Sequence, residues 1–177
     1  SKLTFELNKN KSKKGQLVIR AFFSQDRWVE FQYSLFPDSY LLDYSITSSN
    51  FQSFIDASGP NRLEWNLKSF RNSKSVEYEN RYTELTYGYE NDKVNELSIT
   101  GTDEEKVDEI QWISYKQHFF NSILIPDKKI DNVFLKSENL VQSEDKKEKY
   151  TKLYSSVIPI KNSGDFDLKF KWYFGPS

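Results

Sequence analysis

Hydrophobic and polar residues alternate along most of this chain, most regularly near its C-terminus. The clearest run lies between Asp165 and Phe174, where every second residue from Phe166 onward is apolar. A period of two is typical of a β-strand with one buried face and one solvated face. Gly175-Pro176 follows this run, and we expect the pair to end the strand.

Shorter stretches of the same alternation predict further strands. These runs cover residues 3–7, 29–35, 40–47, 63–67 and 85–89. Residues 16–23 and 153–160 are more continuously apolar, which favours central strands buried on both faces. Pro37-Asp38-Ser39 separates two of the runs and predicts a hairpin turn. Many short strands divided by turn residues predict an all-β sandwich.

Three segments depart from the alternation. The charged residues from Thr102 to Glu109 fit a short helix, because Thr102 and Glu105 have the spacing of a capping box, but a solvated loop is the favoured interpretation. We also expect a solvated loop from Ser143 to Lys149. The segment from Trp112 to Ile125 has helical spacing in its first half and resembles a short strand in its second half, so periodicity alone does not decide between them.

Composition narrows the class of protein. A chain of 177 residues suits one domain, and its 16% of aromatic residues supplies much of the surface to be buried. The 25 basic and 26 acidic residues nearly cancel, which argues against a nucleic-acid partner. The chain has no cysteine, so disulfides and thiol nucleophiles are excluded. It also has no methionine, and we therefore expect a domain excised from a longer protein.

No catalytic set is evident in the sequence. His118 is the single histidine, and without cysteine or a second imidazole it does not form an ordinary zinc site. Nucleophile elbows and phosphate-binding glycine loops are absent as motifs. Most carboxylates near the strands fall on polar faces. We therefore expect a protein that is not an enzyme and that uses no cofactor and no metal.

Several aromatic segments together resemble a known family. They are Leu63-Glu-Trp-Asn-Leu-Lys68, Tyr82-Thr-Glu-Leu-Thr-Tyr87, Trp112-Ile-Ser-Tyr-Lys-Gln-His-Phe-Phe-Asn-Ser-Ile-Leu-Ile125 and Trp172-Tyr-Phe-Gly-Pro176. In combination they resemble the large periplasmic domain of the YidC membrane protein insertases. The resemblance is strongest from Leu63 to Ile125 and at the last few residues. The first sixty residues are similar only in their general pattern and not in particular motifs.

The resemblance implies a β-supersandwich of two stacked antiparallel sheets, with a minor helix near the C-terminus. It implies a strand through Tyr115, a helical turn near Gln117 to Phe120 and a second strand to Ile125. Residues 1–177 would then form a single periplasmic β-sandwich domain of a longer inner-membrane protein. In the family, the chain after the Gly-Pro pair continues into an amphipathic helix and the membrane-embedded insertase core.

For function, the resemblance implies a non-catalytic domain that assists insertion and folding of inner-membrane proteins through protein contacts. The implied partners are Sec translocon components, nascent membrane-protein segments and the rest of its own chain. The candidate membrane-proximal or interaction residues are Trp112, Phe119, Phe120, Trp172, Tyr173, Phe174, Gly175 and Pro176.

A second hypothesis is a carbohydrate-binding β-sandwich, similar to galactose mutarotase-like domains but without their catalytic residues. It predicts an exposed row of aromatic rings, to which Trp28 and Trp65 would contribute. Trp65 and Trp172, however, are in phase with neighbouring apolar residues, which favours core positions for both.

Overall fold

The computed structural model describes residues 4–51, 61–141, 149–160 and 164–177 of the chain. They form two compact units, each treated separately below. Unit 1 comprises residues 1–61 and 160–173, and unit 2 comprises residues 62–159 and 174–177.

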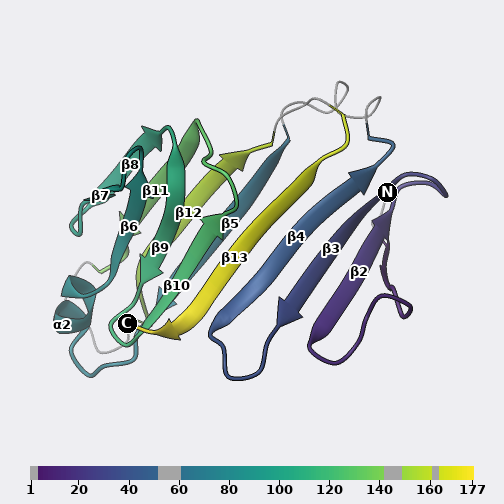
Figure 1. Cartoon of the computed structure of the whole chain (residues 1–177). Helices are drawn as coiled ribbons and strands as arrows, with labels where there is room; N and C mark the ends of the chain where they lie inside the picture. The colour runs from purple at the N-terminus through teal and green to yellow at the C-terminus, as the bar shows by residue number, and fades with distance from the viewer. Residues whose placement is uncertain (1–3, 52–60, 142–148, 161–163) are drawn as a thin grey trace. The chain divides into compact units, whose positions relative to one another are not determined.

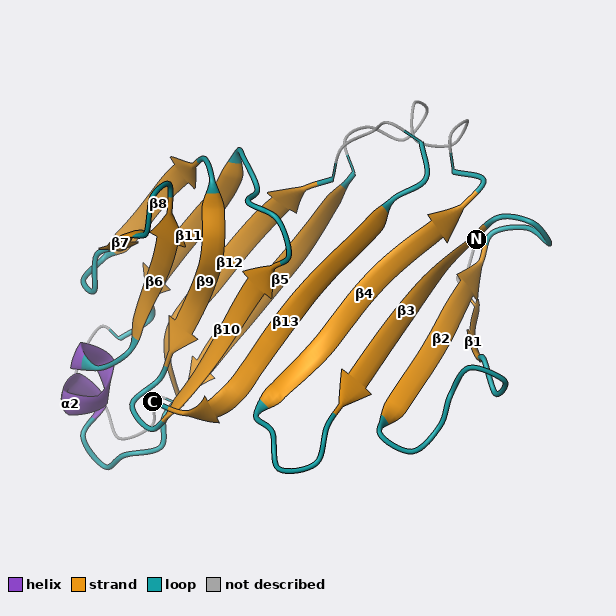
Figure 2. Cartoon of the chain, in the orientation of Figure 1, coloured by secondary structure: helices purple, strands orange, loops and turns teal. Residues whose placement is uncertain are grey.

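Unit 1 is built on antiparallel strands in the order β1-β2-β3-β4-β13 (Figure 2). These strands are β1 (Thr4–Leu7), β2 (Gln16–Phe22), β3 (Trp28–Leu35), β4 (Leu41–Ser49) and β13 (Asp167–Pro176), the last of which leaves the unit after Tyr173. The Asp165 carboxylate accepts hydrogen bonds from the backbone N–H groups of Asn50 and Phe51 at 3.0 and 2.9 Å. These bonds hold the start of β13 beside the end of β4.

Unit 2 contains two sheets and one described helix (Figure 1). One sheet has the order β10-β9-β6-β7, with β6 (Glu84–Tyr89), β7 (Lys93–Glu96), β9 (Ile110–Lys116) and β10 (Phe120–Pro126). The other has the order β5-β12-β11-β8, with β5 (Arg62–Phe70), β8 (Thr102–Val107), β11 (Val133–Asn139) and β12 (Tyr150–Pro159). The helix is α2 (Val76–Arg81).

The two sheets of unit 2 pack face to face through aromatic side chains. The Tyr115 ring of β9 lies 3.8 Å from the Trp65 ring of β5 and 4.9 Å from the Tyr154 ring of β12. The Tyr115 hydroxyl also lies 2.6 Å from Ser156 Oγ on β12. Tyr115 and Tyr154 are fully buried. This arrangement confirms the prediction of an all-β sandwich of antiparallel sheets.

Most of the predicted strands are confirmed, including the hairpin at Pro37-Asp38-Ser39, where Asp38 adopts a φ of 58°. β12 is a central strand, as expected, since it pairs with β5 and β11. It is not buried on both faces, because five of its ten residues are buried and these alternate with less buried residues from Leu153 to Ile158. β2 pairs on both sides but is not buried on both faces, since Leu17 remains 44% exposed.

Three sequence predictions about helices and loops are wrong. The described helix lies at Val76–Arg81, in the middle of the chain, and not near the C-terminus. Residues Gln117 to Phe120 form the tight turn of the β9–β10 hairpin, closed by a 2.8 Å bond from Gln117 N–H to Phe120 O, and not a helical turn. Residues Thr102–Val107 form strand β8, which pairs with β11, and are neither helix nor loop.

The end of β13 also differs from its prediction. Strand geometry continues through Gly175 and Pro176, which were expected to end it. Alternation holds from Leu168 to Trp172 and then fails, because Phe174 is 47% exposed although its position in the pattern predicts burial. The predicted loop at Ser143 to Lys149 lies almost entirely outside the described residues.

Candidate aromatic contact surface

Exposed aromatic side chains gather at one end of unit 2. The elements that carry them are α2, the β9–β10 turn and the last residues of the chain, which lie close together (Figure 1). Phe119 and Phe120 of the turn are 50% and 57% exposed, and Phe174 is 47% exposed. Ser177 joins the chain end to the turn, since its N–H donates to Phe119 O at 3.1 Å and its hydroxyl donates to Gln117 O at 3.0 Å.

Helix α2 adds two tyrosines to this end of the unit. Tyr78 lies on α2 and Tyr82 is the C-cap residue of the helix. Their ring centroids lie 5.0 Å apart, and the side chains are 49% and 43% exposed. A hydrogen bond with Tyr82 raises the pKa of Tyr78. We call the set of Tyr78, Tyr82, Phe119, Phe120 and Phe174 the C-terminal aromatic surface.

The histidine ring of the β9–β10 turn links the tyrosines to the phenylalanines. The ring of His118 lies 5.4 Å from Tyr78, 5.0 Å from Tyr82 and 4.1 Å from Phe119, measured between centroids. Its Nδ1 atom is buried and has no hydrogen-bond partner among the described residues. His118 therefore serves as a packing centre for this surface.

The position of α2 is fixed by a buried carboxylate. Glu79 is fully buried, and its oxygens accept hydrogen bonds from Asn72 N–H at 2.7 Å and from Ser73 N–H at 2.6 Å. The Ser73 hydroxyl donates to the same carboxylate at 2.7 Å. Ser75 caps the helix by accepting from Tyr78 N–H. Since Glu79 and the buried Val76 face inward, Tyr78 and Tyr82 are held outward.

The structure brings together some of the residues singled out from the sequence. Phe119, Phe120 and Phe174 lie in the C-terminal aromatic surface, and Gly175 and Pro176 lead into Ser177 beside it. Trp112 lies near the opposite end of β9 from the turn, where it pairs with Gly88 of β6. Trp172 and Tyr173 belong to unit 1.

The sequence analysis missed the two tyrosines of α2. Signals for the helix were present in Ser75, which is an N-cap residue, in Glu77 and Glu79 in the first turn, and in Arg81 in the last turn. A helix of six residues is too short for the helical period to be visible in the sequence.

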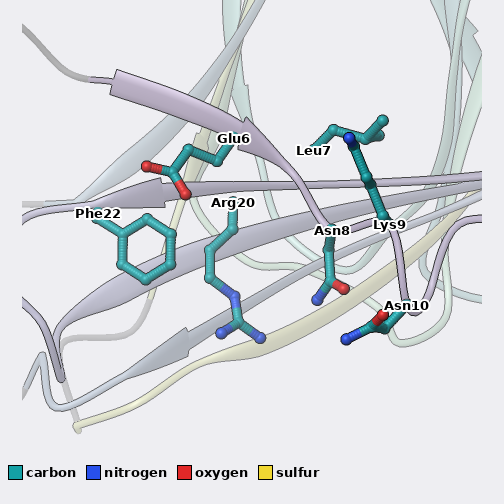
Figure 3. Close-up of a pocket in the computed structure, with 7 residues that line it drawn as sticks. All are labelled: Glu6, Leu7, Asn8, Lys9, Asn10, Arg20 and Phe22. Carbon is teal, nitrogen blue, oxygen red and sulfur yellow. The ribbon is translucent and has the colours of Figure 1, made fainter.

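Unit 1 contains a small polar pocket of about 310 Å³ beside β1 and β2 (Figure 3). The residues lining it are Glu6, Leu7, Asn8, Lys9, Asn10, Arg20 and Phe22. The Arg20 guanidinium is already engaged, because it donates to the buried Glu30 carboxylate at 2.6 Å and lies 3.8 Å over the Trp28 ring. Glu6 is the one carboxylate in the lining, so the pocket does not present the carboxylate pair of a glycosidase.

Glu30 is a buried acid of unit 1 that forms ion pairs with two basic residues. Burial raises its pKa, but hydrogen bonds from Lys11 and Arg20 outweigh burial and lower the pKa below its ordinary value of 4.5. The Lys11 ammonium lies 2.8 Å from Glu30 Oε1. The carboxylate therefore ties the loop after β1 to β2 and β3.

The four tryptophans do not form an exposed row. Trp28 is covered by Arg20, Trp65 stacks on Tyr115, and the Trp172 ring lies 5.9 Å from that of Tyr44 in unit 1. Trp112 lies against Gly88, where a Cβ atom would overlap the indole. The carbohydrate-binding hypothesis gains no support from these positions.

The described residues hold no cluster of three or more histidine, cysteine or acidic side chains that would suit a metal ion. In the same part of the chain, no helix has the length and apolar character needed to cross a membrane.

Comparison with known proteins agrees with the resemblance noted in the sequence. A family model described as the YidC periplasmic domain matches residues 1–177. The chain is 30% identical over 164 residues to the "Membrane protein insertase YidC" of Azobacteroides pseudotrichonymphae, and 29% identical over 165 residues to that of Porphyromonas gingivalis strain W83. Each match covers 92% of this chain and 26% of the relative. The chain thus spans about a quarter of the length of these relatives.

Proposed function

Since the chain belongs to the YidC periplasmic domain family, we propose that it is a non-catalytic domain that assists insertion and folding of inner-membrane proteins through protein contacts. The relatives carry the name of membrane protein insertases, and the family is periplasmic. On this proposal the domain stands on the periplasmic side of the inner membrane as one part of a longer chain.

The observation that carries the proposal is the C-terminal aromatic surface. Five aromatic side chains between 43% and 57% exposed lie at one end of unit 2. Aromatic residues are enriched in the contact regions of protein interfaces, because each ring buries a large area at a small cost in conformational entropy. A contiguous group of exposed apolar side chains on a folded domain marks an interaction site, whereas single exposed residues are common on any protein.

The arrangement around this surface suits a preformed contact. Glu79 and its three donors fix α2, while Ser177 fixes the β9–β10 turn, so the rings need little reordering on binding. A rigid contact surface loses less conformational entropy when a partner binds. We infer that Phe119, Phe120 and Phe174 are the anchors of the contact.

The partners that the resemblance implies are Sec translocon components, nascent membrane-protein segments and the rest of the same chain. Gly175 and Pro176 adjoin the proposed contact surface at the chain end, and we propose that they are membrane-proximal, together with Trp172 and Tyr173. In this arrangement the C-terminal aromatic surface faces the insertase core or a protein bound to it.

The experiment uses the whole insertase chain in cells. The double variant Phe119→Ser, Phe120→Ser is compared with the control Phe70→Ser. Phe70 is a 53% exposed residue of β5 that lies outside the proposed surface. The double variant is expected to lose most of the translocon subunits that copurify with the insertase and to slow insertion of a translocon-dependent substrate. Equal copurification from both variants at equal protein levels would contradict the proposal.

A further inference from the structure

The hairpin between β3 and β4 in unit 1 ends in four exposed apolar side chains. Leu35 is 52% exposed, Phe36 57%, Tyr40 60% and Leu41 37%. The turn is closed by Ser39 Oγ, which accepts from Leu41 N–H at 3.0 Å. The hairpin therefore presents its largest apolar side chains at the point where the chain reverses, which is the most solvent-accessible part of the element.

Two lysines lie beside this hairpin. Lys13 and Lys14 are exposed residues of the loop between β1 and β2, and Lys13 forms a bridge to Gln16 at the start of β2. Leu35 N–H donates to Gly15 O at 2.8 Å, so the lysine loop is bonded directly to the end of β3. Figure 2 shows both loops at the same end of these strands.

The close approach of the two loops depends on a glycine. Gly15 has a φ of +77°, a conformation that other residues adopt only with strain. A Cβ atom at this position would lie 2.7 Å from Leu35 O, too close for a normal contact. The sequence thus specifies a backbone that holds Lys13 and Lys14 next to Leu35 and Phe36.

We propose that this end of unit 1 docks on an anionic lipid surface. We call it the lysine–aromatic tip and define it as Lys13, Lys14, Leu35, Phe36, Tyr40 and Leu41. Aromatic and aliphatic side chains prefer the boundary between headgroups and acyl chains, and nearby lysines pair with lipid phosphates.

The charge around the tip favours an anionic lipid surface as its partner. Asp38 is the single acid of the turn, while Lys13 and Lys14 carry two positive charges and Lys9 stands exposed earlier in the same loop. Lys11, by contrast, is already paired with Glu30. The inference is separate from the proposed protein contacts, which lie on unit 2, so each can fail without the other.

The first test is cosedimentation of the 1–177 chain with vesicles. Vesicles containing phosphatidylglycerol should bind the chain, pure phosphatidylcholine vesicles should bind it more weakly, and added salt should release it. Lys13→Gln with Lys14→Gln should lower the affinity by about 25-fold, since each lysine near an anionic surface contributes about fivefold. Phe36→Ser with Tyr40→Ser should abolish sedimentation.

Matched control variants distinguish a specific role of the tip from the general effect of losing positive charge or an exposed aromatic ring. Lys106→Gln with Lys128→Gln removes the same charge from exposed positions of unit 2, and Phe70→Ser removes an equally exposed ring. These variants should bind as the wild type does. Failure of the wild type to bind phosphatidylglycerol vesicles, or equal losses in tip and control variants, would overturn the proposal.

A second measurement remains informative if the Phe36→Ser, Tyr40→Ser variant does not fold. Because the chain has no cysteine, Phe36→Cys places a single thiol at the tip for an environment-sensitive fluorophore. Its emission should shift to the blue with phosphatidylglycerol vesicles and be quenched by spin-labelled lipids. The same label at Val94→Cys, a 65% exposed site on β7, should not respond. An unchanged spectrum at Phe36→Cys refutes lipid docking.

Discussion

The rings of Trp65 and Tyr115 stack with centroids 3.8 Å apart and planes 19° from parallel, which joins β5 of one sheet to β9 of the other in unit 2. The Tyr115 hydroxyl also donates to Trp65 O at 2.9 Å and lies 2.6 Å from Ser156 Oγ. One buried side chain thus supplies both the apolar and the polar contact between the sheets.

Tyr115→Phe should destabilise the protein by about 1–3 kcal/mol, because it leaves buried partners of the hydroxyl without their hydrogen bonds while the ring stack remains. Urea unfolding measures the change. Tyr40→Phe, at a 60% exposed site, is the control and should be close to neutral. A neutral Tyr115→Phe would mean that the hydroxyl contacts do not contribute to stability.

Gly88 on β6 makes room for the Trp112 indole on β9. A Cβ atom at Gly88 would overlap the indole nitrogen, so Gly88→Ala should cost about 1–3 kcal/mol through displacement of the ring. In a Trp112→Ala background the same change should cost much less, because the overlapping ring is gone. A double-mutant cycle by chemical unfolding tests this, and purely additive effects would contradict the account.

Glu30 makes the stability of unit 1 sensitive to acid. Its pKa in the folded state lies below the ordinary 4.5, so its contribution is complete above about pH 4.5 and is lost as the pH falls through the lower folded value. Glu30→Gln should therefore be less stable than the wild type at neutral pH, and the difference should shrink in acid. Glu64→Gln is the control and should change stability little at neutral pH, because Glu64 forms an exposed ion pair with Arg62.

Lys152 should make stability depend on pH in alkaline solution. It is fully buried, and burial lowers its pKa from 10.5 to about 8, although Glu84 acts to raise it. Between these values the unfolded chain binds a proton that the folded chain has released, so the free energy of unfolding rises with pH. The wild type should gain stability relative to Lys152→Met across this window, and the control Lys106→Met, which keeps Lys152, should gain stability as the wild type does.

Much of the fold follows from alternation in the sequence. The period of two in β13 and the Pro37-Asp38-Ser39 turn are visible because one face of each strand is buried and the turn needs particular residues. The sequence analysis missed β8 because most of its side chains are exposed and charged. The strand forms through backbone pairing with β11. Backbone pairing with a distant strand leaves little trace in local sequence.

The C-terminal aromatic surface was predicted only in part. Phe119 and Phe120 stand out as adjacent rings in the sequence, whereas Tyr78 and Tyr82 become part of the surface only because buried Glu79 fixes α2. Phe174 was a candidate interaction residue through the family resemblance, whereas alternation alone placed it on the buried face of β13. The burial pattern changes phase after Trp172. Such a change depends on the residues that pack around the strand end.

The most direct test of the central claim is photo-crosslinking in the whole insertase. A photoreactive amino acid at position 120 should give crosslinks to translocon subunits or to nascent membrane-protein segments. The same probe at position 70, which is similarly exposed on β5, should give few or none. Absence of protein crosslinks at position 120, or equal crosslinking at positions 120 and 70, would contradict a contact role for the C-terminal aromatic surface.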